Sequence, residues 1–257
     1  MQPAMIWSNL NGLMWLLLML VPLIFLQRLL YREFQAVFIL ITHKPGMAIS
    51  LFALVFLPGV FLHELSHLVV ARLVGVRTGR FSLLPRPMPD GHLQLGYVET
   101  SQTDWIRASL IGTAPLIVGG LFVAFAANYR MELPLLWDVL RKGQIELFWM
   151  GVVALPNLHD FWLWFYLTFV VSSTMLPSNS DRHAWLPLGF VLILLFGLAV
   201  LVGAGPWMLD KLAPPINSML RALAMLFGIS VIVHAILLLP IAGFHKILVR
   251  ITGFDIG

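Results

Sequence analysis

The chain has 257 residues, of which 60% are hydrophobic and only 11% are charged, and its formal net charge is +4. Soluble domains carry about 25% charged residues, so a chain this apolar cannot hide its side chains in one aqueous core and needs the bilayer as its main solvent. Its 16 Lys and Arg form no dense basic run, which argues against nucleic acid as a partner, and the absence of cysteine excludes disulfides and thiolate metal ligands. The composition predicts an all-α polytopic membrane protein that forms one transmembrane domain over residues 1–257.

Six apolar segments are long enough to cross a bilayer, which takes about 20 residues. They cover residues 6–27, 47–75, 104–129, 158–178, 184–209 and 216–243. The first segment has no charged residue before Arg28 and no cleavage site of a secretory signal, so we expect a retained transmembrane helix, followed by an interfacial stretch at 28–44. The last segment carries His234, which we expect to be a hydrogen-bonded packing residue. About six transmembrane helices are therefore predicted.

Two connections between these segments have a mixed composition. In residues 81–100, three prolines and the turn signal Asp90-Gly91 precede a stretch of alternating polarity, which predicts a small β-hairpin beside the membrane. We expect His92 to be a surface residue of this hairpin. Residues 130–157 mix charges with apolar runs, which is typical of an interfacial helix followed by a segment that dips into the membrane.

The second apolar segment contains the pattern H-E-x-x-H, formed by His63, Glu64 and His67. Four residues advance a helix by one turn plus about 40°, or about 6 Å, so both histidines lie on one face and can bind a single metal ion. Zn²⁺ would acidify a bound water, Glu64 would take its proton, and the activated water would attack a peptide carbonyl. The other interpretation is a polar patch that packs helices or lines a cavity. Because three ionisable groups in an apolar span cost a few kcal/mol each, packing alone does not explain this trio.

A catalytic zinc site needs a third protein ligand, which must come from outside the motif. Asp181 is our choice, because Pro177 ends or kinks the fourth segment and an unwound stretch there can fold an aspartate back toward the metal. His183 is the rival ligand. Asp160 and His159 begin the same segment, about 30 Å away along a helix, so they cannot be at the metal together with Asp181.

These residues resemble the site-2 protease family of intramembrane zinc metalloproteases. The resemblance covers roughly residues 47–185, and it includes three sequence pieces besides the H-E-x-x-H helix. They are Leu95-Gly96-Tyr97-Val98-Glu99, Gly112-Thr113-Ala114-Pro115, and Met175-Leu176-Pro177 with Asp181. The chain departs from the family pattern where Asp181 is followed by Arg182 instead of glycine, and where the family's substrate-binding asparagine falls at Thr174. A threonine hydroxyl can donate one hydrogen bond but cannot copy an amide.

The resemblance implies hydrolysis of peptide bonds within a membrane-spanning protein or peptide, by a catalytic core at about 47–185. Asp181 would be the third Zn²⁺ ligand, and Thr174 would take part in substrate binding. Gly96, Tyr97 and Val98 would bind an unwound substrate by strand addition.

The connections on the two predicted sides of the membrane carry nearly equal numbers of Lys and Arg, so charge does not decide the orientation of the protein. By analogy with the family we expect the plasma membrane of a prokaryote, with both termini in the cytosol.

Two alternatives remain open. The first is a non-catalytic zinc-binding membrane scaffold derived from a protease. The second is another class of membrane zinc peptidase, acting on prenylated or soluble peptides, whose third ligand is a glutamate later in the chain. No glutamate follows Glu146, which argues against that class. The oligomeric state is not indicated by the sequence.

Overall fold

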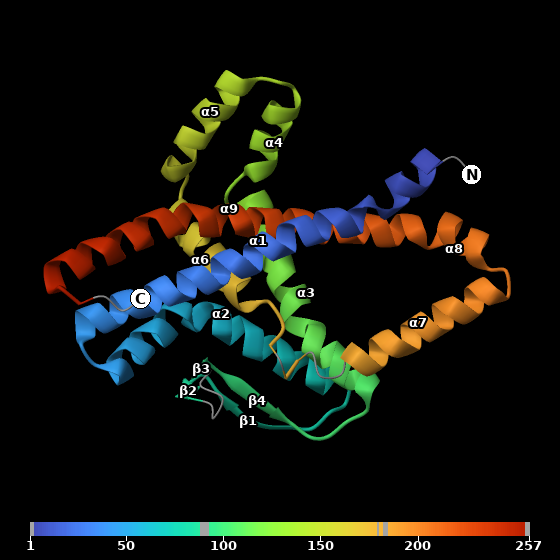
Figure 1. Cartoon of the computed structure of the whole chain (residues 1–257), viewed down its shortest axis with the longest axis horizontal. Helices are drawn as coiled ribbons and strands as arrows, with labels where there is room; N and C mark the ends of the chain where they lie inside the picture. The colour runs from blue at the N-terminus through green and yellow to red at the C-terminus, as the bar shows by residue number, and fades with distance from the viewer. Residues whose placement is uncertain (1–2, 88–92, 179, 182–184, 255–257) are drawn as a thin grey trace.

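The structure is a computed structural model that describes residues 3–87, 93–178, 180–181 and 185–254 (Figure 1). In chain order its elements are α1 (Pro3–Thr42), α2 (Pro45–Leu73), β1 (Thr78–Ser82), β2 (Arg86–Pro87), β3 (Leu93–Gln94), β4 (Tyr97–Thr100), α3 (Trp105–Tyr129), α4 (Leu133–Arg141), α5 (Ile145–Ala154), the 3₁₀ turn η1 (Leu155–Asn157), α6 (Phe161–Thr174), α7 (Trp185–Leu201), α8 (Gly205–Lys211) and α9 (Ala213–Thr252). The mainly helical fold and the small hairpin agree with the sequence prediction.

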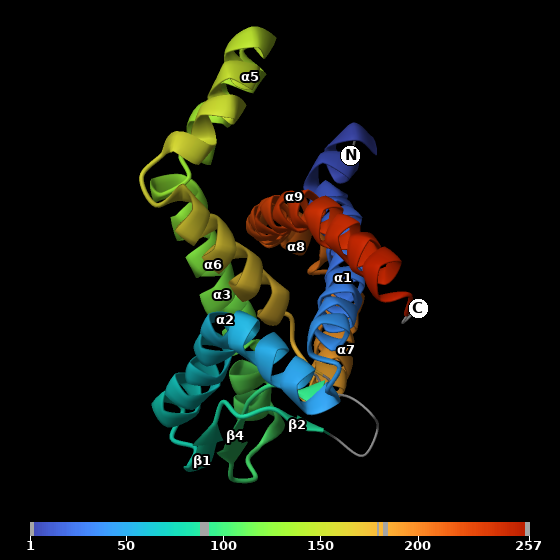
Figure 2. The ribbon, with the colours of Figure 1, turned by 90° about the vertical axis from the view of Figure 1, so that its left-hand side faces the viewer.

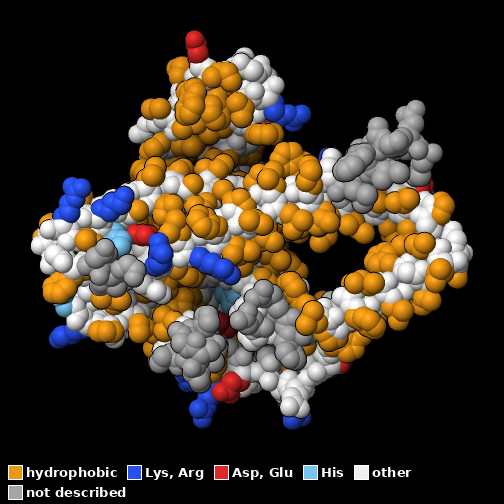
Figure 3. All heavy atoms as spheres, viewed as in Figure 1, with side chains coloured by type: hydrophobic (Ala, Val, Ile, Leu, Met, Phe, Trp, Pro, Cys, Tyr) orange, Lys and Arg blue, Asp and Glu red, His pale blue; other side chains and the backbone are white. Residues whose placement is uncertain are grey.

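Four helices, α1, α2, α3 and α9, are long and apolar enough to cross a membrane, so the chain is an integral membrane protein. Hydrophobic side chains are spread over much of the face shown in Figure 3, above all along the long helices, as expected for a surface in contact with lipid. The predicted span at 184–209 is broken, because α7 and α8 meet at an angle of 117°. Gly203 has a φ of 85° there and Pro206 follows in the first turn of α8, so the helix cannot continue.

The expected number of six spans is not confirmed. By length and composition, four helices qualify, or five if α7 and α8 together form one broken span. The predicted segment at 158–178 contains only α6, whose 14 residues fall short of the usual length of about 20.

Helices α1 and α9 are longer than predicted, with 40 residues each. The stretch at 28–44 was expected to be a separate interfacial segment, but α1 continues through it as far as Thr42. The two helices pack side by side, from a hydrogen bond between the Gly12 amide and Asn217 to a contact of 2.7 Å between His245 Nδ1 and Glu33 Oε2 (Figure 1). Residue numbers rise together along this contact, so the two helices are parallel.

The predicted hairpin is present and begins slightly before residue 81. β1 pairs with β4 and β2 pairs with β3, both antiparallel, so the four short strands form a ribbon of two two-stranded sheets, with the inner pair nested in the connection of the outer pair. The ribbon starts near the C-terminal end of α2 and the N-terminal end of α3 and runs along α2 (Figure 1). Its tip, including His92, lies outside the described residues.

The segment at 130–157 forms a helical hairpin of α4 and α5 that projects from the rest of the molecule (Figure 2). Neither helix has a buried residue, and Trp137 and Trp149 are both well exposed. The contact of this hairpin with a membrane stays a prediction.

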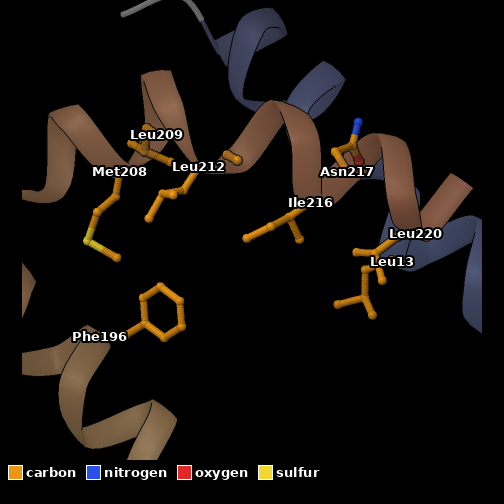
Figure 4. A pocket seen from close by; sticks show the side chains of 9 residues that line it. Leu13, Phe196, Met208, Leu209, Leu212, Ile216, Asn217 and Leu220 are labelled. Atoms are coloured by element: carbon orange, nitrogen blue, oxygen red, sulfur yellow. The ribbon is translucent and has the colours of Figure 1, made fainter. Parts of the chain in front are cut away.

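Two regions of the interior differ in how they are packed. An aromatic core around Phe56 and Phe169 joins α1, α2 and α6, and it lies beside the H-E-x-x-H turn of α2. At the other end, an apolar pocket of about 250 Å³ lies between α7, α8, α9 and the start of α1 (Figure 4). Phe196 and Met208 face each other across it, and none of the lining residues is ionisable.

Candidate metal centre

His63 and His67 lie on one face of α2, and their Nε2 atoms are 3.1 Å apart. The other ring nitrogen of each histidine contacts a backbone carbonyl. His63 Nδ1 is 2.6 Å from the oxygen of Thr174 on α6, and His67 Nδ1 is 2.9 Å from the oxygen of Ile111 on α3. Because a carbonyl only accepts hydrogen bonds, each neutral imidazole carries its proton on Nδ1 and has a lone pair on Nε2. The two lone pairs therefore point at the same small space.

The carboxylate of Asp181 completes this group. Its Oδ1 is 3.3 Å from His67 Nε2, and its Oδ2 is 3.7 Å from His63 Nε2. Tetrahedral zinc with bonds of about 2.0–2.1 Å holds its ligand atoms about 3.3 Å apart, so the observed separations match such a site. Two lone pairs and a carboxylate this close repel one another unless positive charge lies between them. The donor set and its spacing therefore fit a divalent metal ion, and Zn²⁺ in particular.

The loop after α6 brings Asp181 to this position. The backbone N–H and the hydroxyl of Ser178 both donate to Asp181 Oδ2, at 2.8 and 2.6 Å. Burial raises the pKa of the Asp181 carboxyl, but the contacts with His63 and His67 and the bond from Ser178 hold that pKa well below its usual range. The carboxylate is therefore ionised, as a metal ligand must be.

Glycines allow the helices and this loop to approach closely. A Cβ on Gly112 of α3 would lie 2.3 Å from the carbonyl oxygen of Asp181. A Cβ on Gly59 of α2 would lie 2.3 Å from the carbonyl oxygen of Val170 on α6. Small residues commonly permit such contacts between transmembrane helices. The metal-ligand geometry thus depends on two glycines that are not ligands.

Glu64 is buried next to the two histidines and interacts electrostatically with both of them and with Asp181. The chain before β4 passes directly over it. A Cβ on Gly96 would lie 2.9 Å from Glu64 Cγ and 3.2 Å from its Oε1, so only glycine fits without a shift. The predicted base and the predicted substrate-binding strand are therefore neighbours.

Tyr97 and Val98, the other two strand residues of the predicted site, pair with Ser82 and Phe81 of β1. Among the described residues, the opposite edge of β4 has no strand partner. That edge offers main-chain hydrogen bonds to an added strand.

Thr174 lies at the end of α6 and contacts the centre through its backbone. Its hydroxyl donates back to the carbonyls of Val170 and Val171 in its own helix, at 3.0 and 3.2 Å. Its carbonyl, in contrast, orients His63. Substrate binding by Thr174 stays a prediction. The contact of its carbonyl with His63 was not predicted, because any residue type can offer a backbone acceptor.

The remaining candidates lie away from this centre or outside the described residues. His183, the rival third ligand, belongs to the latter group. Asp160 lies before the start of α6, at the end away from Asp181, as predicted. Its carboxylate contacts His159 at 2.7 Å. His234 is fully buried and hydrogen-bonded at both ring nitrogens, which confirms it as a packing residue. The contributions of Ile111, Ser178 and Gly59 were not predicted. Gly112 was noted only as part of the small-residue piece of the family resemblance, and Gly96 only as a residue that binds substrate.

Searches of protein families, of curated proteins and of solved structures found no match to this chain.

Proposed function

We propose that this protein is an intramembrane zinc metalloprotease that hydrolyses peptide bonds of membrane-spanning substrates. One observation carries the proposal: metal-binding atoms of His63, His67 and Asp181 all lie within 4.8 Å of one another, with Glu64 beside them. Burying three ionisable groups in an apolar helix bundle costs stability, so such a cluster is a mark of a functional site.

The protein's own groups hold the site ready for a metal. The carbonyls of Ile111 and Thr174 fix the proton on Nδ1 of each imidazole, which leaves both Nε2 atoms free as ligands. A bound Zn²⁺ supplies a Lewis acid that acidifies water and polarises a carbonyl. His63, His67 and Asp181 would hold the ion, and a set of only three protein ligands would leave it accessible to water or substrate.

Glu64 acts as the general base and then as the general acid. It accepts a proton from the attacking water as the water oxygen bonds to the scissile carbonyl carbon. It returns that proton to the amine of the departing strand as the C–N bond breaks, so the reaction consumes one water and leaves the enzyme unchanged.

The substrate must reach this site as an extended chain, because the backbone of a transmembrane helix is closed by its own hydrogen bonds. The free edge of β4 can bind such a segment by strand addition. Gly96 lies against Glu64, so a substrate strand aligned on β4 passes close to the base. By the family resemblance, we place the protein in the plasma membrane of a prokaryote.

The proposal is tested with purified protein in lipid nanodiscs. We expect about one Zn²⁺ per chain and cleavage of peptides drawn from a library of transmembrane segments. Glu64→Gln should retain zinc and lose cleavage. A non-catalytic scaffold would bind zinc, yet show no cleavage and no dependence on Glu64. Cleavage confined to prenylated or soluble peptides would favour the other peptidase class, and a protein without zinc would refute the metal centre.

A further inference from the structure

The C-terminal end of α6 is held by side chains from other helices. The last carbonyls of a helix have no partner within it, and in a bilayer they must find one elsewhere. The Ser173 carbonyl accepts hydrogen bonds from Gln27 Nε2 at 2.5 Å and from the Tyr31 hydroxyl at 2.8 Å, both on α1. The next carbonyl, that of Thr174, contacts His63 of the metal centre. Two consecutive peptide groups therefore join α1 to a metal-binding imidazole.

Helix α9 holds the same residue through its side chain. Ser173 Oγ is 2.9 Å from His234 Nε2, and His234 Nδ1 is 2.7 Å from the carbonyl oxygen of Ser230. Since that carbonyl can only accept, His234 carries its proton on Nδ1 and accepts from the Ser173 hydroxyl at Nε2. Ser173 and His234 are both fully buried, so neither can exchange this partner for water.

We infer that Gln27, Tyr31 and His234 are positioning residues for the metal centre. They fix the peptide at Ser173, and the adjoining Thr174 carbonyl then fixes the imidazole of His63. This inference rests on the proposed metal site. It predicts that residues on the outer helices α1 and α9 control metal affinity although they are not ligands.

The test compares two Tyr→Phe substitutions, each of which removes one hydroxyl that donates to a backbone carbonyl. Tyr31→Phe removes a hydroxyl bonded to a carbonyl next to the metal centre. Tyr166→Phe removes a hydroxyl that donates to the Val55 carbonyl at 2.6 Å, and so also joins α6 to another helix, but two turns before Thr174. Zinc affinity is measured on the full chain by competition with a chelator, and the absorption spectrum is recorded with Co²⁺.

Tyr31→Phe combined with Gln27→Leu should weaken Zn²⁺ binding about tenfold and change the Co²⁺ spectrum, whereas Tyr166→Phe should stay within about twofold of wild type. His234→Gln, which keeps an acceptor for Ser173, should bind zinc more tightly than His234→Leu. Equal affinities in all variants would overturn the positioning role and leave the proposed function intact. A wild-type protein that binds no zinc would instead refute the proposed function.

A second inference comes from the direction of the helices. The contacts of Gly12 with Asn217 and of Glu33 with His245 show that α1 and α9 run in parallel. If both cross the bilayer, they cross it in the same direction. The chain between them must then cross an odd number of times, which excludes the four intervening crossings of a six-span protein.

Helices α2 and α3 supply two of these crossings, and α6 fits as the third. It runs parallel to α2, since Tyr166 contacts Val55 while Val170 and Thr174 lie against Gly59. The sharp bend between α7 and α8 suits a segment that returns to the side from which it started. The geometry points to five crossings, with the start of α1 and the end of α9 on opposite sides of the membrane. This differs from the sequence-based expectation that both termini are cytosolic.

The natural chain has no cysteine, so single cysteines can be placed and labelled without background. Lys44→Cys and Glu99→Cys mark the two sides of the membrane, and the informative positions are Lys211 and Phe254, which are both exposed. With a membrane-impermeant maleimide on sealed vesicles, we expect Lys211→Cys to react from the same side of the membrane as Glu99→Cys. We expect Phe254→Cys to react from the same side as Lys44→Cys. Six crossings would give the reverse pairing and overturn the inference.

Discussion

The candidate metal centre and the apolar pocket near α7 are held together in different ways. At the centre, His63 and His67 each have a carbonyl partner, and the backbone approaches closely at Gly59 and Gly112. At the pocket, hydrophobic side chains meet around an open space, and large side chains of α7 such as Leu201 are highly exposed. Hydrophobic contacts of this kind can be exchanged for contacts with lipid, whereas a carbonyl or carboxylate inside the bundle needs its own partner. Changes at the centre should therefore cost activity, and similar changes at the pocket should not.

The largest effect is expected from removing the metal. Incubation with 1,10-phenanthroline and gel filtration should reduce peptide cleavage to background, because the zinc ion that acidifies the attacking water is removed. Adding Zn²⁺ should restore it. Cleavage that survives in fully zinc-free protein would mean that the centre is not the active site.

A strong effect is expected when Gly112 gains a side chain. In Gly112→Val, the added carbons meet the Asp181 carbonyl and displace the third ligand, so zinc affinity should fall about 10- to 100-fold. The matched control is Gly197→Val in α7, where a Cβ meets nothing within 4 Å. Comparable zinc affinities for the two variants would contradict the difference between the two regions.

An intermediate effect is expected for Gly96→Ala. The new Cβ presses on Glu64 and Val60, which moves the base without touching a metal ligand. We expect kcat to fall about tenfold, since displacement of a catalytic group by about 1 Å costs up to two orders of magnitude. Zinc content, measured on the same sample, should be unchanged. A loss of zinc would show that the strand supports the ligands instead.

The smallest effect is expected at the pocket. Phe196→Ala enlarges a space that is already open, so cleavage and zinc affinity should stay within about twofold of wild type. A steady-state comparison in nanodiscs checks this. A large fall in kcat would mean that α7 takes part in the reaction.

The sequence predicted those parts of the site whose signal is local. The spacing of His63 and His67 follows from the helix repeat, and the hairpin follows from its turn residues. Asp181 was found through its position after Pro177 together with the family resemblance. What was missed depends on partners distant in sequence: Glu33 fits inside a long helix because His245 of α9 pairs with it.

Backbone roles were also hidden from the sequence. The carbonyls of Ile111 and Thr174 orient the histidines, and any residue type could supply them. The break at Gly203 appeared as part of a continuous apolar segment, because composition alone does not show a left-handed backbone. Helix directions, and with them the number of crossings, required the pairing of α1 with α9.

Zinc content of the purified full chain, compared among wild type, Asp181→Ala and His183→Ala, tests the central claim most directly. We predict about one Zn²⁺ per chain in the wild type and in His183→Ala, and a large loss in Asp181→Ala. A wild type without zinc, or a loss in His183→Ala with none in Asp181→Ala, would contradict the metal centre described for His63, His67 and Asp181.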